Sequence, residues 1–277
     1  MVTVPSVKLN NGIEMPSLGF GVFQIAPEEV MGPVGVALEA GYRLIDTAWG
    51  YRNEEGVGRA VRESGVPREQ LFITTKLTNA EHGYDRALRA FDASLTKLGM
   101  DYVDLYLIHW PVPMADLYVE TWRAFEKLYA DGRARSIGVS NFTVAHLQRL
   151  IDETGTVPAV NQVELHPRLA QPALREFGAL HGVATEAWAP IGQGKGLLGD
   201  PSIKEMATRY GKSPAQVVLR WHLQIGTIAI PKSVTPARIR ENLNVLDFEL
   251  SPADVLRLSE LGPEQRIGPD PGTFDGR

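Results

Sequence analysis

The sequence contains no cysteine, so it can form no disulfide bond and has no thiolate chemistry. A chain without cysteine suits a reducing compartment, and we expect a cytoplasmic protein. No apolar run approaches the ~20 residues that a membrane span requires, and the N-terminus lacks the regions of a signal peptide. The net charge of −5 includes no basic excess, which argues against nucleic-acid binding.

The composition that is present is ordinary for a globular protein, with 44% apolar and 22% charged residues among 277. No linker or change in composition divides the chain, so we expect a single domain over residues 1–277. Apolar runs alternate with helical patterns, which indicates an α/β fold with a parallel sheet. Eight such units favour a closed (β/α)8 TIM barrel, although an open doubly wound sheet also matches this pattern. The runs begin near Leu18, Leu44, Phe72, Val103, Ile137, Val160, Ala184 and Ile228.

Segments outside this repeat lie at both ends of the chain. The run Val7–Met15 alternates around Asn11-Gly12, which is typical of a β-hairpin, and we expect this hairpin to plug the bottom of the barrel. An extra helix is expected at Ser202–Tyr210, and two further short helical elements near Ser251–Leu261. The helices of the repeating units are expected at Val30–Ala40, Glu54–Ser64, Asp85–Leu98, Leu117–Ala130, Val144–Glu153, Pro172–Leu180, Pro214–Gln224 and Pro236–Asn242.

Polar or aromatic residues stand at the C-terminal ends of most of the apolar runs. In a barrel of parallel strands these ends meet at one rim, where barrel enzymes build their active sites. The pattern therefore predicts an enzyme. The strand-end residues are Asp46, Lys76, His109, Ser140, Asn141, Gln162, Trp188 and Lys232.

Tyr51 lies in the loop just after Asp46, and Lys76 and His109 end the next two strands. A phenol with a pKa of ~10 is a weak acid at neutral pH unless a nearby positive charge stabilises its anion. Lys76 would supply that charge, Asp46 would hold the lysine, and His109 could donate a hydrogen bond to a carbonyl oxygen. The set suits protonation of a developing alkoxide. The structural alternatives are a plain Asp46–Lys76 ion pair, a surface tyrosine and a core histidine.

No glycine-rich fingerprint marks a dinucleotide site, because Gln24 replaces the third glycine after Gly19-Phe20-Gly21. The segment Lys232–Pro236 leads into a helix, whose free N–H groups and dipole favour an anion. Lys232 and Arg238 add two cations there, and two cations with a hydroxyl group suit a dianionic 2′-phosphate. This argues for NADPH over NADH. A solvated basic helix face is the alternative.

The chain resembles the aldo-keto reductase superfamily, in order and over nearly its whole length. Within that superfamily it most resembles the bacterial 2,5-diketo-D-gluconate reductases. The motifs that carry the resemblance are Gly41-Tyr42-Arg43-x-Ile45-Asp46-Thr47-Ala48 with Tyr51 and Asn53-Glu54, Thr75-Lys76, Asp104-Leu105-Tyr106-Leu107-Ile108-His109-Trp110-Pro111, Gly138-Val139-Ser140-Asn141-Phe142, Asn161-Gln162-x-Glu164-x-His166-Pro167, Gly192-Gln193-Gly194-Lys195 and the run from Ile230 to Asn242.

The resemblance implies that Tyr51 is the general acid, that Asp46 and Lys76 tune it, and that His109 orients the carbonyl group. It also implies hydride transfer from NADPH to an aldehyde or ketone carbon without a metal ion. Ser140, Asn141 and Gln162 would hold the nicotinamide carboxamide, and Trp188 would stack on its ring. The further cofactor contacts implied are Lys232, Ser233, Val234, Arg238, Glu241 and Asn242.

The pocket for the substrate is expected on the same rim. Many bacterial relatives have a tryptophan where this chain has Thr78, so the pocket is expected to be wider or more polar there, with Trp49 refilling the space. The resemblance also implies that the tail Arg266–Phe274 folds over the rim. The expected substrate contacts are Phe23, Trp49, His109 and Trp110.

The leading hypothesis is an NADPH-dependent oxidoreductase that reduces small aldehydes, α-dicarbonyls or keto-sugar acids such as 2,5-diketo-D-gluconate to alcohols. The alternative is a non-catalytic NADPH-binding barrel that acts as a structural or regulatory subunit. His109, Glu164 and His166 raise a third hypothesis, a metal-dependent hydrolase, but no metal-binding spacing such as His-Glu-x-x-His is present. We expect a monomer whose partner is a small carbonyl compound, with no metal, membrane or nucleic acid.

Overall fold

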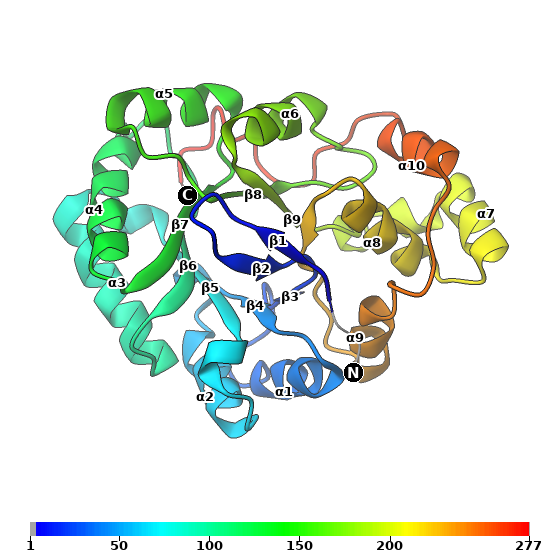
Figure 1. The fold of residues 1–277 in the computed structure, drawn as a ribbon, viewed down its shortest axis with the longest axis horizontal. Coiled ribbons are helices and arrows are strands. Elements are labelled where there is room, and N and C mark those ends of the chain that lie inside the picture. Colours follow the sequence, from blue (N-terminus) through cyan, green and yellow to red (C-terminus); the bar gives the residue numbers. More distant parts are fainter. Residues whose placement is uncertain (1–3, 277) are drawn as a thin grey trace.

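In a computed structural model that describes residues 4–276, an eight-stranded parallel sheet curls around the centre of the molecule (Figure 1). Neighbouring strands follow one another in sequence order, and a parallel bridge between Leu18 and Ala229 joins the two edges. The sheet is therefore a closed barrel, which confirms the expected fold and excludes the open sheet. The barrel strands are β3 (Phe20–Gly21), β4 (Leu44–Asp46), β5 (Phe72–Leu77), β6 (Val103–Ile108), β7 (Ala134–Ser140), β8 (Val160–Glu164), β9 (Ala184–Trp188) and β10 (Ile228–Ala229).

Helices surround the barrel, and most of them turn an apolar face toward it (Figure 1). In α3, for example, Ala87, Phe91 and Leu95 recur at a spacing of four residues and are all buried. The helix bounds differ by at most one residue from those expected for the repeating units and the extra helix. The helices are α1 (Met31–Ala40), α2 (Glu54–Glu63), α3 (Tyr84–Leu98), α4 (Tyr118–Ala130), α5 (Val144–Thr154), α6 (Pro172–His181), α7 (Pro201–Tyr210), α8 (Pro214–Gln224), α9 (Pro236–Leu243) and α10 (Pro252–Ser259).

The region Ser251–Leu261 forms one helix, α10, so the prediction of two short elements was wrong. The Ser251 side chain accepts a hydrogen bond from the backbone N–H of Asp254, and Pro252 occupies the first turn. An N-cap followed by proline starts one helix, and nothing in the next seven residues interrupts it.

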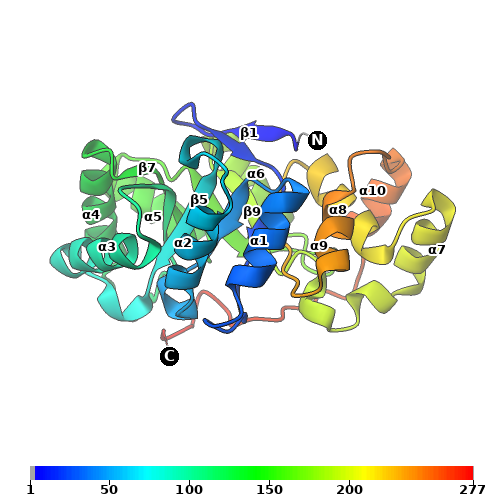
Figure 2. The same cartoon turned by 90° about the horizontal axis from the view of Figure 1, so that it is seen from below.

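The N-terminal hairpin consists of β1 (Ser6–Lys8) and β2 (Glu14–Pro16), which pair antiparallel. Figure 2 shows this hairpin and the C-terminal segment on opposite sides of the barrel. Leu9 and Met15 of the hairpin pack into the interior cluster that includes Leu44 and Phe72, near the beginnings of β4 and β5. The hairpin therefore plugs the end of the barrel where the strands start, as expected.

Alternation along each strand separates the barrel interior from the layer under the helices. On β6, Leu105 and Leu107 belong to the interior cluster, whereas Tyr106 and Ile108 belong to the outer core. The Tyr106 ring stacks on Phe125 of α4, with 4.4 Å between ring centroids. Within residues 4–276, none of the helices has the length and apolar character that a membrane span needs.

Candidate active site

Four polar side chains from the C-terminal ends of β4, β5 and β6 meet at the end of the barrel opposite the hairpin. Asp46 is the last residue of β4, Lys76 lies near the end of β5, and His109 directly follows β6. Tyr51 lies in a short 3-10 helix, Trp49–Tyr51, between β4 and α2. These strands are adjacent and parallel, so the sequence positions predicted from strand ends become spatial neighbours.

Lys76 is completely buried and has three hydrogen-bond acceptors around its ammonium group. Its Nζ lies 2.6 Å from Asp46 Oδ1, 3.0 Å from the Thr47 carbonyl oxygen and 3.4 Å from the Tyr51 hydroxyl. Burial lowers the pKa of Lys76, but the Asp46 charge, the interaction with Tyr51 and the hydrogen bond to Asp46 together outweigh burial and raise that pKa above its ordinary value. Lys76 is therefore charged at neutral pH, and its three N–H donors are all used.

The Tyr51 hydroxyl keeps its proton more firmly than the sequence led us to expect. Burial raises the pKa of Tyr51, and the opposing effect of the Lys76 charge is smaller, so the pKa lies above its ordinary value of 10.0. The expected effect of Lys76 is right in sign, but the net direction is the opposite. Tyr51 is thus a protonated phenol at neutral pH, which is the state that a proton donor requires.

His109 stands beside Tyr51 as a neutral imidazole. The two ring centroids lie 5.7 Å apart. Burial, followed by the Lys76 charge and His82, lowers the pKa of His109 to about 3. Within residues 4–276 its ring nitrogens make no hydrogen bond, although its backbone oxygen accepts one from Asn141 Nδ2 at 2.9 Å. A neutral imidazole can donate one hydrogen bond to a ligand oxygen.

The residues expected to bind a carboxamide form one hydrogen-bonded group. Ser140 Oγ donates to the Gln162 carbonyl oxygen at 2.8 Å, and Asn141 Nδ2 donates to Ser140 Oγ at 3.1 Å. Trp188 Nε1 donates to Asn141 Oδ1 at 2.8 Å. Both donors of the Asn141 amide are therefore used within the protein. The side-chain oxygen of Gln162 has no partner among the described residues and can still accept a hydrogen bond.

Glu186 belongs to the same site, although the sequence analysis did not select it. The residue is fully buried on β9, and its Oε2 accepts a hydrogen bond of 2.9 Å from Gln162 Nε2. Gln162 Nε2 also donates to Asp46 Oδ2 at 2.8 Å. The signal in the sequence was an acidic residue in the middle of a short predicted strand, two positions before Trp188. Because side chains alternate along a strand, these two share the interior face.

The expected phosphate site lies on the loop after β10 and at the start of α9. Lys232 and Arg238 are exposed, and neither makes an ion pair within the described part of the chain. The α9 N-cap, Thr235, makes no side-chain cap hydrogen bond, so N–H groups of the first turn are available to an anion. Ser233 and Glu241 are half-buried, Val234 is exposed, and Asn242 is buried on α9.

The residues expected to contact the substrate lie in three aromatic contacts and one cation–π contact. Phe23 packs on Tyr51 with ring centroids 5.0 Å apart, and Tyr51 in turn contacts His109. Trp110 packs on Phe274 of the tail at 4.5 Å. Trp49 instead lies against the ammonium group of Lys97 on α3, 3.3 Å from the ring centroid. The structure thus groups Phe23 with the tetrad and holds Trp49 by a contact to a helix.

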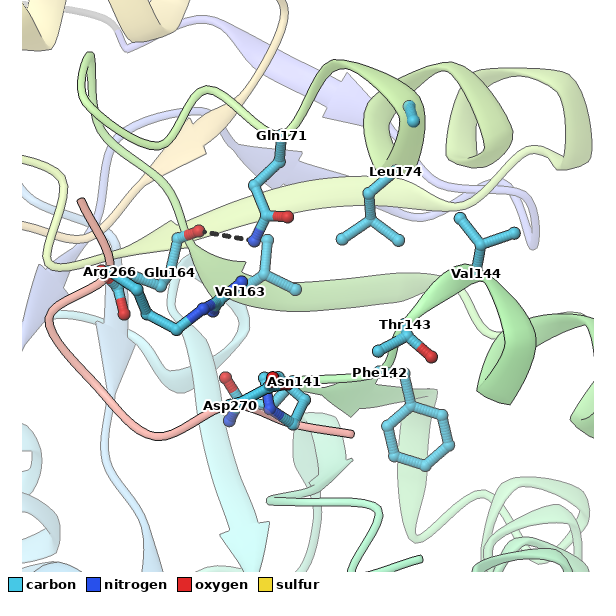
Figure 3. Close-up of a pocket in the computed structure, with 12 residues that line it drawn as sticks. Asn141, Phe142, Thr143, Val144, Val163, Glu164, Gln171, Leu174, Arg266 and Asp270 are labelled. Atoms are coloured by element: carbon cyan, nitrogen blue, oxygen red, sulfur yellow. Dashed lines mark hydrogen bonds between the residues drawn. The ribbon is translucent and has the colours of Figure 1, made fainter. Parts of the chain in front are cut away.

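The C-terminal tail is fastened to the end of β8 by Glu164. Its Oε1 and Oε2 accept hydrogen bonds from the backbone N–H groups of Ile267 and Gly268, at 2.5 and 2.8 Å. Gly268 approaches Trp188 so closely that an added Cβ would lie 2.6 Å from the ring. Beneath the tail is a cavity of about 220 Å³, bordered by Asn141 and Arg266 and by none of the tetrad residues (Figure 3).

A metal-binding group was one hypothesis for the histidines of this rim. Within residues 4–276 no cluster of three or more histidine, aspartate or glutamate side chains could hold a metal ion. His166 Nε2 instead pairs with Glu164 Oε1 at 3.1 Å, on the carboxylate that binds the tail. Glu164 and His166 therefore serve to anchor the tail.

Known proteins are similar to this chain over nearly its whole length. The profile of the Aldo/keto reductase family matches residues 17–263. An aldo-keto reductase of Mycolicibacterium smegmatis is 56% identical, and methylglyoxal reductase DkgA of Escherichia coli K12 is 51% identical, each over 271 residues that cover 98% of both chains. A solved structure of a Gox0644 mutant in complex with NADPH has a TM-score of 0.94 and 46% identity, and covers 99% of both chains. This chain belongs to the aldo-keto reductase family.

Proposed function

We propose that this protein reduces small aldehydes, α-dicarbonyls or keto-sugar acids to alcohols, with Tyr51 as the general acid. The observation that carries the proposal is the position of the Tyr51 hydroxyl, 3.4 Å from Lys76 Nζ and beside the His109 ring. Asp46 pairs with the same ammonium group at 2.6 Å. A phenol, an ammonium group and a neutral imidazole around one point suit proton delivery to a carbonyl oxygen.

Membership of the aldo-keto reductase family makes the chain an oxidoreductase that uses NADP(H), as its NADPH-bound structural neighbour does. When bound, NADPH supplies the hydride. The side chains fit it at two places. The Gln162 side-chain oxygen, which has no partner among residues 4–276, can accept from a carboxamide N–H. Lys232 and Arg238, which make no ion pair with the same residues, lie beside the open N-terminus of α9 and suit a 2′-phosphate.

The roles of the side chains in proton transfer follow from their protonation states in the protein without bound cofactor. Tyr51, which holds its proton at neutral pH, donates that proton to the carbonyl oxygen as the carbon becomes tetrahedral. The phenolate that remains lies next to Lys76, whose charge stabilises it. Asp46 and the Thr47 carbonyl oxygen keep Lys76 in place throughout. His109, which is neutral and whose ring nitrogens have no partner among residues 4–276, donates a hydrogen bond that orients the substrate.

The substrate class draws support from the relatives and from the aromatic surroundings. One relative with 51% identity carries the name methylglyoxal reductase, and methylglyoxal is a small α-dicarbonyl. Phe23 gives Tyr51 an apolar neighbour, and Trp110, which directly follows His109 in the chain, packs on Phe274 of the tail. We accordingly propose methylglyoxal as the first compound to test, followed by phenylglyoxal, aromatic aldehydes and 2,5-diketo-D-gluconate.

The test is a spectrophotometric screen of NADPH consumption with these compounds. Turnover that is lost in Tyr51→Phe while NADPH still binds supports the proposal. Turnover that persists in this variant would show that the acid lies elsewhere. NADPH binding without turnover of any compound in the wild-type protein would favour the non-catalytic alternative, in which the barrel is a structural or regulatory subunit.

We further propose that the chain acts as a single-domain monomer in the cytoplasm, without nucleic-acid partners. The absence of cysteine supports the cytoplasmic location, and the net charge of −5 argues against nucleic-acid partners. Size-exclusion chromatography with light scattering would test the monomer, and an apparent mass of twice 30.4 kDa would contradict it.

A further inference from the structure

Glu186 is a buried carboxyl group inside the barrel, hydrogen-bonded to Gln162, one of the residues expected to bind the nicotinamide carboxamide. It pairs in register with Gln162 on β8 and with Ile228 on β10, and its side chain is completely buried inside the barrel. Trp188, two residues further along the same face of β9, is the residue expected to stack on the nicotinamide ring. Two residues of a strand span about 6.6 Å, so a ring on Trp188 would lie close above Glu186.

The hydrogen bonds around Glu186 leave one of its oxygens without a partner. The Gln162 amide has two N–H donors, and one goes to Asp46 Oδ2 and the other to Glu186 Oε2. Glu186 Oε1 is buried and makes no hydrogen bond with any described residue. One carboxyl oxygen therefore has a donor, while the other is available to carry a proton.

A count of the charged groups around Glu186 also indicates that this carboxyl group carries a proton. Asp46 and Glu186 are two buried carboxyl groups near one ammonium group, Lys76. All three donors of Lys76 are used by Asp46, Thr47 and Tyr51, and none reaches Glu186. A buried carboxylate without a cation partner is costly, and two neighbouring carboxylates favour retention of one proton. Burial, followed by the Asp46 charge, raises the pKa of Glu186 to about 8.

We propose that Glu186 is protonated in the free protein and in the NADPH complex, and that it releases this proton to solvent when NADP⁺ binds. This inference rests on the proposed cofactor placement, with the nicotinamide ring on Trp188. The O–H bond at Glu186 breaks, its electron pair stays on the carboxylate, and the buffer takes up the proton. No redox change is involved in this step.

The reason is the difference in charge between the two forms of the cofactor. The nicotinamide ring of NADP⁺ carries a positive charge, which stabilises an ionised carboxyl group nearby, whereas the ring of NADPH is neutral. Among residues 4–276, the other titratable groups facing Glu186 are Asp46 from β4, Lys76 from β5 and Tyr51, while Ile228 of β10 and Ile230 just after it are apolar. Asp46 is already paired with Lys76, so Glu186 is the carboxyl group with a proton to lose.

The consequence is that pH changes the affinities for the two forms differently. Raising the pH ionises Glu186, which strengthens NADP⁺ binding and leaves NADPH binding without this contribution. The 2′-phosphate also titrates near neutral pH, but it is present in both forms and cancels in their ratio. The protein would then release its oxidised cofactor more readily in acidic conditions.

The experiment is isothermal titration calorimetry in buffers of different ionisation enthalpy, which counts the protons released as each cofactor form binds. At pH 7 we expect the wild-type protein to release roughly one half to one proton more with NADP⁺ than with NADPH. Glu186→Gln keeps the size of the side chain and an oxygen that can accept from Gln162, but it cannot ionise. This variant should lose the difference, whereas Tyr51→Phe should retain it.

The proposal is overturned if the wild-type protein shows no difference, if Glu186→Gln retains it, or if Tyr51→Phe abolishes it. Should Glu186→Gln not fold, the proposal is tested by the pH dependence of a ratio, that of the NADP⁺ dissociation constant to the NADPH dissociation constant. This ratio is measured in the wild-type and Tyr51→Phe proteins. Between pH 6 and 8 this ratio should fall by up to about tenfold per pH unit in both proteins, and a constant ratio would refute the proposal. None of these readouts depends on turnover, so loss of carbonyl reduction would be a separate result.

Discussion

The two ends of the barrel interior are built from different kinds of residues on the same strands. At the hairpin end the interior is apolar, and at the opposite end it is polar and hydrogen-bonded. The apolar layer includes Leu9, Met15, Leu44, Phe72, Leu105 and Ile228. The polar layer includes Asp46, Lys76, Gln162 and Glu186.

This difference teaches which residues contribute to stability and which to chemistry. Removing apolar side chains from water stabilises the fold, whereas burying carboxyl and ammonium groups is costly even when they are paired. β4 contributes Leu44 to the apolar layer and Asp46 to the polar layer, only two residues apart. We therefore expect substitutions in the apolar layer to reduce stability alone, and substitutions in the polar layer to reduce activity.

The largest effect is expected from Tyr51→Phe, which removes one oxygen from the polar layer. Carbonyl reduction should fall by about 10²- to 10⁴-fold, the usual contribution of a general acid. The thermal midpoint should change little, because the hydroxyl makes a single hydrogen bond with the described residues, at 3.4 Å. Steady-state kinetics and thermal denaturation would measure the two quantities.

Tyr129→Phe is the matched control for this change, because Tyr129 is exposed on α4. Its activity should equal that of the wild-type protein. Equal activity of the two variants would contradict the assignment of Tyr51.

The next effect concerns the buried cation. Lys76→Met leaves Asp46 without its ammonium partner, and breaking a buried pair in this way costs about 3–5 kcal/mol of unfolding free energy. Activity should be lost as well, so this substitution in the polar layer reduces both stability and activity. Chemical denaturation compared with Lys127→Met, whose exposed i,i+4 pair with Asp131 is worth at most about 0.5 kcal/mol, isolates the effect of burial.

Leu105→Ala tests the apolar layer. Truncating a fully buried leucine should lower the unfolding free energy by about 2–5 kcal/mol. The catalytic constants of the folded fraction should be unchanged, because the Leu105 side chain is apolar and takes no part in the hydrogen bonds of the polar layer. A large loss of kcat at constant stability would contradict the separation of the two layers. Leu256→Ala, on an exposed part of α10, is the control and should be nearly neutral.

The smallest effect is expected outside the barrel interior, at the proposed 2′-phosphate site. Arg238→His should weaken NADPH binding by about tenfold, equivalent to ~1.4 kcal/mol, and leave NADH binding nearly unchanged. Arg240→His on the same helix is the control, since Arg240 pairs with Glu39 at 3.2 Å. Equal losses for NADPH and NADH in Arg238→His would refute the phosphate assignment.

The order of strands and helices could be predicted because the information for it is local. Helix ends such as Gly41 and Gly99, which adopt φ values of 116° and 62°, interrupt the helical pattern within a few residues. Tyr51, Lys76 and His109 could be selected for a related reason, since strand ends in a barrel always face one rim.

Other features depend on residues far apart in the chain, and the sequence did not reveal them. Glu186 became a candidate only when Gln162 was seen to bridge it to Asp46. The role of Glu164 in holding the tail involves partners more than a hundred positions away. The contact of Trp49 with Lys97 links a loop to a helix that follows the next strand.

The sequence by itself determined the alternation of strands and helices, the residues at the strand ends and the kind of chemistry they suit, because periodicity and residue type do not depend on surroundings. Closure of the sheet into a barrel was decided by the parallel bridge between Leu18 and Ala229, which the sequence left open. Only the tertiary structure decided the protonation states. Burial raises the pKa of Tyr51 despite Lys76, and lowers that of His109 to about 3. Such shifts arise from the loss of water around a group and from charges brought near it, and both exist only once the barrel has closed.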